Sequence, residues 1–330
     1  MRSLLALVSL LALIPRIASA NDAAASTAAG GIQLRQEARI SMEKELLSIS
    51  ENKITVEYEF LNETDRDIAT EIAFPVPPYD LNWTDAQGSR SIDDFHVWVE
   101  GRPLNYRTEA KAMLRGVDES ALLLKMGIDI ASFAHFFEDN EGRRGSRDIQ
   151  RLSLPLQREL IHAGLIDKED KLPTWTVFKT YHWQETFPAR RLLHVRHEYA
   201  PVIGFEQLNG VDLRGKGTPR FANVSNACVD LPLQKKLVSE IPKTDGVIPT
   251  FWIDYILTTA NTWKKPIKQF ELIVERPQPD GTWRVRRAHW DVSFCWDGKV
   301  EQPDSNHFVA RARNFIPGKD LHVMFFGLGP

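Results

Sequence analysis

The stretch TYHWQETFPARRLLHVRHEYAPVIG, residues 180–204, is rich in the aromatic and branched residues that favour β-strands. Its middle, Phe187-Pro188-Ala189-Arg190, has turn chemistry and separates two strand-like halves. With the turn placed there, Thr186 faces Arg191 and the halves pair as an antiparallel hairpin. This hairpin, and the strand-like segments on both sides of it, predict a fold built from β-sheets.

Three histidines make the predicted hairpin a candidate ligand site. Successive residues of a strand point to opposite faces of the sheet. His194 and His197 are separated by an odd number of positions, so they point to opposite faces. In the predicted pairing His182 and His197 share a face as diagonal neighbours, roughly 7–8 Å apart. A metal bound by these two would need a third ligand from elsewhere, and we expect the core to cover this face.

Other segments show the same β pattern. KITVEYEF, residues 53–60, alternates apolar with polar residues as a half-buried strand does. IATEIAFPVP, residues 68–77, follows a turn-forming sequence and predicts the return strand. FHVWVEGRPLNYR, residues 95–107, predicts a hairpin around Glu100-Gly101. Further strands are predicted along the chain from residue 175 onward.

Residues 108–172 differ in character from the β segments around them. Helix-forming sequences cover residues 108–114, 119–126, 131–137 and 154–166. The fold class we expect is therefore mainly β, with one or more antiparallel β-sandwiches and a helical insert between β segments. The expected regions are a signal peptide (1–20), an N-terminal β-sandwich region (21–107), a mainly helical insert (108–172) and a C-terminal β-sandwich region (173–330).

The first 20 residues have the organisation of a secretory signal peptide. Arg2 precedes the apolar run Leu4–Ile14, and Ala18-Ser19-Ala20 has the small-residue form of a cleavage site. We therefore expect cleavage after Ala20 and a periplasmic or secreted protein with no transmembrane segment after removal of the signal. The formal charge of −3 is dispersed along the chain, which argues against a nucleic-acid partner.

Two cysteines, Cys228 and Cys295, are present. In an oxidising compartment an even pair favours one disulfide, and the alternative is two separate buried thiols. The sequence contains no GxSxG, HExxH or glycine-rich phosphate loop. We therefore predict no catalytic residues, no metal and no cofactor. These expectations favour a protein that is not an enzyme.

Nine tryptophans are spread along the chain, and exposed tryptophans on a β-sandwich bind sugars. Trp83 and Trp263 lie in polar loop-like contexts and are the better candidates for such a face. Together with His182 and His197 they form the candidate ligand face.

Several segments together resemble the bacterial exported family known as domain of unknown function 4424. They are residues 21–34, 56–77, 180–204, 252–267, 292–298 and 314–323. The resemblance covers nearly all of the chain after the signal peptide and implies an exported bacterial protein, without supplying catalytic residues. It also places Cys228 and Cys295 where cysteines are expected, which supports the disulfide. Residues 56–112 are similar to the vault/inter-alpha-trypsin domain, a β-sandwich used in extracellular assembly and binding.

The function we expect is that of an exported, non-enzymatic protein that acts in binding or envelope assembly. One alternative is a carbohydrate-binding protein that uses exposed tryptophans. A second is a metal-dependent hydrolase built around His182 and His197. The partner is an envelope protein or a glycan under the first two hypotheses, and the sequence does not identify it.

Overall fold

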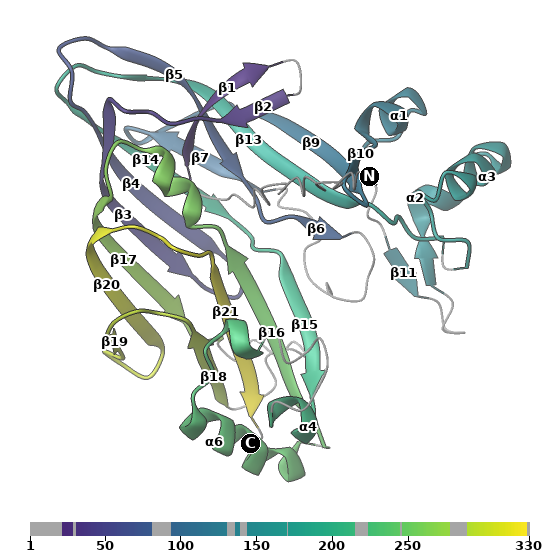
Figure 1. Ribbon diagram of the computed structural model, residues 1–330. Coiled ribbons are helices and arrows are strands. Elements are labelled where there is room, and N and C mark those ends of the chain that lie inside the picture. The colour runs from purple at the N-terminus through teal and green to yellow at the C-terminus, as the bar shows by residue number, and fades with distance from the viewer. Residues whose placement is uncertain are drawn as a thin grey trace, which may run out of the picture.

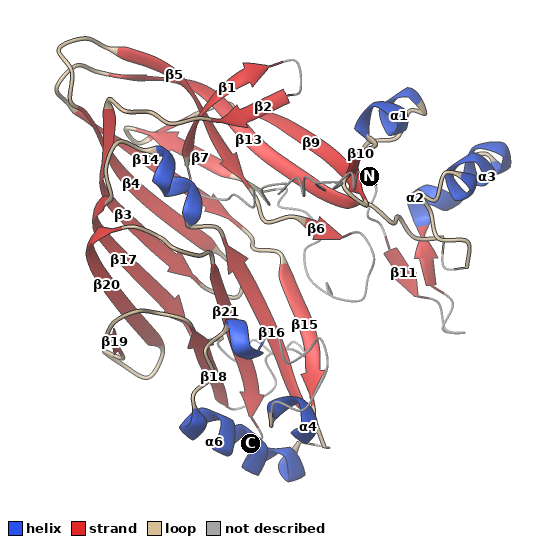
Figure 2. Ribbon diagram, in the orientation of Figure 1, coloured by secondary structure: helices blue, strands red, loops and turns tan. Residues whose placement is uncertain are grey.

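The computed structural model describes residues 22–28, 31–80, 94–130, 136–138, 144–169, 171–214, 224–244, 246–277 and 289–328 (Figure 1). About half of this part of the chain forms β-strands, and short helices lie beside the sheets (Figure 2). The predicted mainly-β fold class is confirmed. The predicted signal peptide and Trp83 lie outside the described residues.

The largest sheet has eight strands and combines segments that are far apart in the sequence. In spatial order they are β19 (Val300–Glu301), β20 (His307–Phe315), β17 (Ile267–Glu275), β3 (Ile40–Ile49), β4 (Ile54–Asn62), β14 (Leu192–Tyr199), β7 (His96–Val99) and β8 (Arg102–Pro103). Neighbouring strands are antiparallel except for β3 and β17, which are parallel. The sheet therefore draws strands from both of the predicted β regions. The division of the chain into three regions stays a prediction.

A seven-stranded sheet forms a second layer. Its strands are β10 (Val117–Asp118), β9 (Arg107–Leu114), β13 (Thr176–Phe187), β5 (Ile68–Pro75), β1 (Ala23–Ala28) and β2 (Gly31–Leu34), and β6 (Tyr79–Asp80) pairs with β13. The four-stranded sheet has the order β15 (Ile203–Leu208), β16 (Ile248–Tyr255), β21 (Leu321–Leu328) and β18 (His289–Phe294). A small sheet pairs β11 (Phe136–Glu138) with β12 (Arg144–Ser146).

Most of the short helices lie at two margins of these sheets. The helices are α1 (Ser120–Lys125), α2 (Arg147–Gln150), α3 (Leu154–His162), α4 (Gly210–Leu213), α6 (Leu231–Glu240), η2 (Ile241–Lys243) and η3 (Thr258–Thr262). The first three gather beside β10 and β11, and α4 and α6 lie at one end of the four-stranded sheet (Figure 2). The helix α3 follows its sequence signals: Ser153 caps its start and Gly164, with φ of 71°, follows its end.

The core lies on one face of the eight-stranded sheet, where the other two large sheets pack. On β4 the side chains of Ile54, Val56, Tyr58 and Phe60 are buried, as the predicted alternation requires. The Phe60 ring meets that of Phe187 in the seven-stranded sheet at 5.8 Å. The Tyr58 hydroxyl lies 3.1 Å from that of Tyr255 in the four-stranded sheet. The opposite face of the eight-stranded sheet carries the polar residues of the same strands.

The predicted hairpin of residues 180–204 is wrong, because its two strands belong to different sheets. Strand β13 pairs with β5, β6 and β9, whereas β14 pairs with β4 and β7. The connection crosses from one layer to the other, and Arg190 in it donates its N–H to the carbonyl oxygens of Asn62 and Thr64. The connection from β4 to β5 crosses between the same two sheets, so these strands do not pair either. Stacking the strands buries the apolar face of each against the other.

The predicted helix at residues 108–114 is also wrong, because this segment is part of β9. Its Ala, Lys and Glu residues favour a helix, but pairing with β13 along its length overrides that preference. The helices predicted at residues 119–126 and 154–166 are confirmed as α1 and α3. The helix predicted at residues 131–137 is wrong in its described part, because Phe136 and Phe137 belong to strand β11. The hairpin around Glu100-Gly101 is confirmed as β7 and β8. Both turn residues have positive φ, 49° and 73°, as a tight hairpin turn requires.

Candidate ligand-binding site

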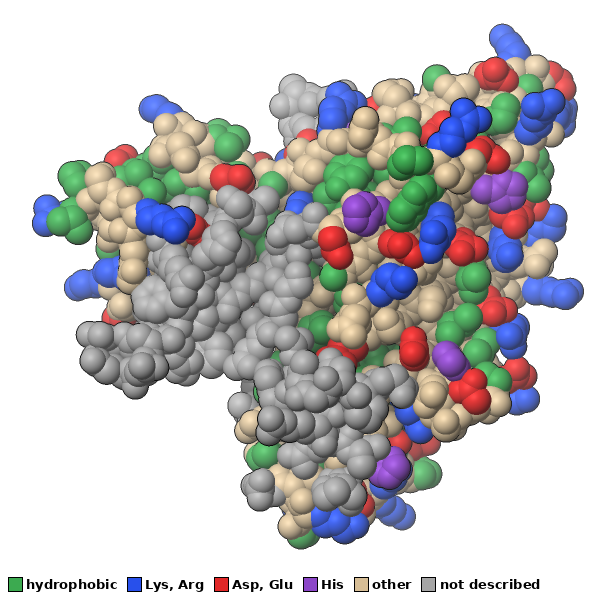
Figure 3. Space-filling model, turned by 180° about the vertical axis from the view of Figure 1, so that it is seen from behind, with side chains coloured by type: hydrophobic (Ala, Val, Ile, Leu, Met, Phe, Trp, Pro, Cys, Tyr) green, Lys and Arg blue, Asp and Glu red, His purple; other side chains and the backbone are tan. Residues whose placement is uncertain are grey.

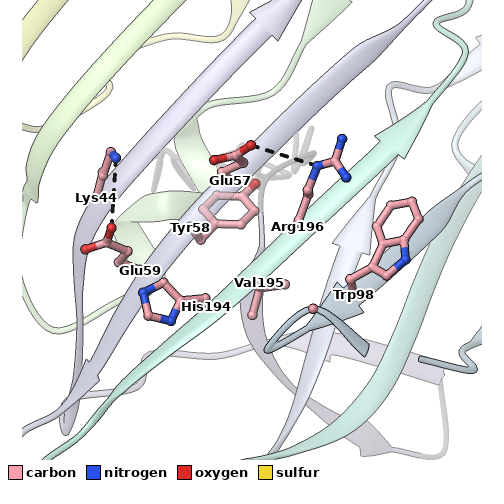
Figure 4. Close-up of a pocket in the computed structure, with 9 residues that line it drawn as sticks. Lys44, Glu57, Tyr58, Glu59, Trp98, His194, Val195 and Arg196 are labelled. Atoms are coloured by element: carbon pink, nitrogen blue, oxygen red, sulfur yellow. Dashed lines mark ion pairs between the residues drawn. The ribbon is translucent and has the colours of Figure 1, made fainter. Parts of the chain in front are cut away.

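A groove of about 370 Å³ opens on the polar face of the eight-stranded sheet. Residues of four neighbouring strands and of the β7–β8 turn line it (Figure 4). Its lining residues are Lys44, Glu57, Tyr58, Glu59, Trp98, Gly101, His194, Val195 and Arg196. Strand alternation explains this set, because Glu57 and Glu59 on β4 and His194 and Arg196 on β14 all point away from the core.

Trp98, which is half-buried, forms one side of the groove. The guanidinium carbon of Arg196, on the paired strand, lies 5.1 Å from the centre of the Trp98 ring. The His96 ring lies 5.8 Å from it along the same strand. Trp98 is therefore held between two polar side chains at the edge of the sheet, with an apolar surface beside hydrogen-bonding groups.

The β7–β8 turn is anchored to β14 from both directions. The Glu100 N–H donates to the carbonyl of His194 at 2.9 Å, and the His194 N–H donates to the Glu100 carboxylate at 2.8 Å. The His194 backbone bond is the main reason that the pKa of Glu100 lies below its ordinary value. An ionised Glu100 strengthens this bond, so the turn that borders Trp98 is fixed in place before any ligand arrives.

The charges in the groove are balanced and paired across strands. The Arg196 Nε lies 3.9 Å from the Glu57 carboxylate, and the Lys44 ammonium lies 3.9 Å from that of Glu59 (Figure 4). Both pairs are partly exposed, so their contribution to stability is small. They supply hydrogen-bond donors and acceptors without a net charge that would select an ionic ligand.

A second groove, of about 260 Å³, continues this polar face and shares Lys44 with the first. It is lined on β17 by Gln269 and Glu271 and on β20 by Arg311 and Arg313. Six strands, from β7 to β20, lie side by side under the two grooves. At about 4.8 Å per strand they span roughly 24 Å. The rear view of the molecule shows acidic and basic side chains mixed across the face rather than gathered by sign (Figure 3).

Trp98 and Arg196 were not among the residues predicted for a ligand face, although a signal for them exists. Phe95 and Val97 are buried, so the alternation of FHVW places His96 and Trp98 on the opposite side. Arg196 alternates in the same way with the buried Val195 and His197. Strand alternation would have found these residues, whereas the polar context of a tryptophan did not.

His182 and His197 do not share a face, because β13 and β14 lie in different sheets. The His182 ring nitrogen Nδ1 lies 2.6 Å from the Glu71 carboxylate, which is also 3.0 Å from Arg107. His182 is 8% exposed and is thus a buried partner of Glu71. The two-histidine metal set is wrong, and the described residues contain no group of three or more His, Cys, Asp or Glu that could hold a metal ion.

His197 lies in the core, where we expected it to be covered. It is 0% exposed and is surrounded by the rings of Tyr58, Phe74, Phe95 and Trp183 at 5.0–5.5 Å. Burial lowers the pKa of His197 to about 3, so the imidazole is neutral at pH 7.

Trp263 is also a core residue and is 2% exposed. Its indole N–H donates to the carbonyl oxygen of Asp22 at 2.8 Å, and its ring centre lies 4.6 Å from that of Phe60. It therefore offers no surface to a sugar. The neighbouring polar residues Asn261 and Lys264 are accessible, which is why the local sequence suggested an exposed position.

Cys228 and Cys295 form a disulfide, with 4.9 Å between their Cα atoms. The bond ties the segment before α6 to the residue that follows β18. The predicted pairing is confirmed.

Comparison with known proteins adds one strong match. The model of a family described as "Domain of unknown function (DUF4424)" matches residues 20–324. No curated protein matches the chain. A solved structure described as a "putative nutrient binding protein" from Legionella pneumophila subsp. pneumophila is similar, with a TM-score of 0.43 and 14% identity over 88% of this chain and 68% of that one. The weaker resemblance of residues 56–112 to the vault/inter-alpha-trypsin domain stays a prediction.

Proposed function

This chain belongs to the family of the domain of unknown function DUF4424, and we propose that it is an exported binding protein whose ligand lies on the polar face of the eight-stranded sheet. The observation that carries the proposal is the groove beside Trp98. It combines an anchored aromatic ring with paired charges on rigid strands, and ligand sites are typically preformed in this way.

The chemistry of the groove favours a neutral, polyhydroxylated ligand, that is, a glycan. An indole ring packs against the apolar face of a sugar, while hydroxyl groups both donate and accept hydrogen bonds. Glu57 and Glu59 accept such bonds, and Lys44 and Arg196 donate them. Because these charges balance, a strongly anionic or cationic ligand gains little net attraction.

The two grooves together suit an elongated ligand that crosses the strands. The second groove brings Glu271, Arg311 and Arg313 into line with the first, again with both signs of charge. A chain of several sugar units matches the span of six strands better than a single sugar does. An envelope glycan is therefore the partner that we propose.

Two features support the exported location. The sequence of residues 1–20 has the organisation of a signal peptide, and the Cys228–Cys295 disulfide is typical of oxidising compartments. None of the helices in the described part of the chain has the length and hydropathy that crossing a membrane requires. We propose that the protein works in the periplasm or outside the cell and acts by binding.

Replacing Trp98 with alanine is expected to weaken glycan binding tenfold or more. The reason is loss of the aromatic anchor, since truncating such a residue costs about 2 kcal/mol or more at a binding hot spot. The measurement is a screen of the mature chain on an array of envelope glycans, followed by calorimetric titration of the best ligand. Trp252→Ala, which removes another partly exposed indole, from β16 in the four-stranded sheet, is the matched control and should bind as the wild type does.

The results of these experiments test the class of ligand, the binding groove and the absence of catalysis separately. Silence on the array, together with capture of an extended peptide that Trp98→Ala abolishes, would keep the groove and refute the glycan. Equal binding by Trp98→Ala and the wild type would refute the groove. Turnover of an envelope substrate by the wild-type chain would refute the non-enzymatic proposal.

A further inference from the structure

A third groove, of about 450 Å³, adjoins the second groove at the β20 side of the eight-stranded sheet. These two grooves share Arg311 and Ala312, just as the first two share Lys44. The third groove is also lined by residues that border the four-stranded sheet, among them Trp296 after β18 and Leu321 at the start of β21. The three grooves therefore follow one another from β7 to β20 and on to Trp296.

Trp296 is held in the third groove as a rigid aromatic surface. Its ring centre lies 5.6 Å from that of Phe270, with the two rings nearly parallel, and 5.3 Å from that of Phe315. The preceding residue, Cys295, is joined to Cys228 by the disulfide. The indole is partly exposed in spite of these contacts, so it offers an anchored ring as the tryptophan of the first groove does.

The loop after β20 supplies a second apolar surface. Ile316 lines the groove and is 64% exposed. The rest of this loop is fixed by hydrogen bonds, because Asn261 donates its side-chain N–H to the Pro317 carbonyl at 3.0 Å. The Asp320 carboxylate accepts from the backbone N–H and the hydroxyl of Thr258 at 3.1 and 2.8 Å. The groove is therefore preformed, which lowers the entropic cost of binding.

The charges that line the third groove balance, as they do in the first. The acidic residues are Asp297 and Asp320, and the basic residues are Arg311 and Lys319. Arg311 is held at the boundary with the second groove, where its guanidinium donates to Glu271 at 2.7 Å and to Glu301 at 2.9 Å. The lining again favours a neutral ligand whose hydroxyl groups both donate and accept hydrogen bonds.

The edge of β20 is unsuited to an extended peptide. Within the described residues β19 pairs with β20 only at Val309 and Ala310, so it leaves the rest of this edge open. The strand conformation is interrupted at Asn314, which has φ of 50°, and Arg311 and Arg313 place exposed charges on the strand. Both features disfavour the addition of another strand. A glycan needs no backbone ladder, so these features do not exclude it.

We propose that Trp296 is a second aromatic subsite and that the ligand is a linear, neutral polysaccharide that occupies all three grooves. This inference rests on the proposed function and names the class of glycan. Trp98 on β7 and Phe315 on β20, which packs on Trp296, are five strand spacings apart, or roughly 24 Å. A disaccharide is too short to contact both indole rings. Affinity therefore rises with chain length, because a chain held at one ring meets the other at a high effective concentration.

The test measures affinity against chain length. The probes are fragments of the array-selected envelope glycan, graded from a disaccharide to the intact chain and titrated calorimetrically into the mature protein. Trp296→Ala should lower the affinity for the intact chain roughly tenfold and leave that of the shortest binding fragment unchanged. Trp98→Ala should weaken both, and the control Trp252→Ala should weaken neither.

The length series distinguishes failure of this inference from failure of the proposed function. If Trp98→Ala weakens binding but Trp296→Ala matches the wild type at every length, the three-groove ligand is refuted and the glycan groove stands. If no glycan binds, or if Trp98→Ala matches the wild type at every length, the proposed function is refuted and this inference falls with it.

A second measurement uses only the wild-type chain and so does not depend on any variant folding. In hydroxyl-radical footprinting read by peptide mass spectrometry, the intact glycan should slow oxidation of both Trp98 and Trp296 severalfold. The shortest binding fragment should protect Trp98 alone. An intact glycan that leaves Trp296 unprotected would overturn the inference, and so would an extended peptide that protects Trp296 when the glycan does not.

Discussion

Replacing both cysteines, in Cys228→Ser/Cys295→Ser, lowers the free energy of unfolding by roughly 4 kcal/mol. The disulfide closes a loop with a sequence separation of 67 residues. In the chain-entropy model a loop of this length stabilises the folded state by about 4 kcal/mol, because the crosslink restricts the unfolded chain. Urea denaturation of the wild type and the variant at pH 7, under non-reducing conditions, gives the difference.

The reduced wild type is the matched control for this variant. With dithiothreitol present in the denaturation series, the wild type should fall to the stability of the double variant, whereas the variant should be unchanged. A wild type whose midpoint is insensitive to the reductant would contradict a stabilising role for the bond. Tryptic peptides containing Cys228 and Cys295 should be linked in non-reducing mass spectrometry.

The second large effect is a loss of stability in acid caused by His197. Its pKa is about 3 in the folded chain and about 6.5 when unfolded, so below pH 6.5 the unfolded state takes up a proton that the folded state does not. This contribution lowers the free energy of unfolding by about 1.4 kcal/mol for each pH unit from pH 6 down to pH 3. His197→Leu keeps a side chain of similar size and removes the titration.

The pH dependence caused by His197 must be measured by comparing two variants, because Asp22 has the opposite effect on stability as the pH falls. Its raised pKa means that the folded state holds a proton that the unfolded state releases above about pH 4, so Asp22 destabilises the fold as the pH rises. His289→Leu, which removes an exposed histidine of β18, is the control. We expect the stability of His197→Leu relative to His289→Leu to increase steadily as the pH falls from 6 to 3. A constant difference would contradict the assignment.

Strand alternation predicted which residues face the core, but not which strands are neighbours. Tyr58, Val195 and His197 occupy the buried sides that their sequence positions require. The two-residue repeat of a strand is the same whether it pairs with its neighbour in sequence or stacks on it in another layer. The turn at Pro188–Arg190 therefore suggested a hairpin, although its backbone is hydrogen-bonded to the last residue of β4 and to Thr64 after it.

Local propensity failed where long-range contacts were decisive. Residues 108–114 favour a helix on their own and become strand β9 because β13 offers them a complete set of partners. Trp263 lies among polar residues in the sequence, yet its indole N–H has a buried acceptor on Asp22, which is 241 residues away. Neither partner is visible in the local sequence.

The groove could have been predicted in part. The alternation of residues 95–98 places Trp98 on the polar face, and the alternation of β14 places Arg196 there. Their proximity depends on the pairing of β7 with β14, which are separated by almost one hundred residues. The sequence therefore identifies members of the site without showing that they meet.

The proposed function is tested most directly by ¹⁹F NMR of the mature chain labelled with 5-fluorotryptophan. Single Trp→Phe variants assign the resonances, and the glycan selected on the array is then titrated. The resonance of Trp98 should shift saturably, while those of the buried Trp263 and of Trp175, which is 0% exposed, stay in place. A bound glycan that leaves Trp98 unchanged and shifts a tryptophan elsewhere would contradict binding on the polar face of the eight-stranded sheet.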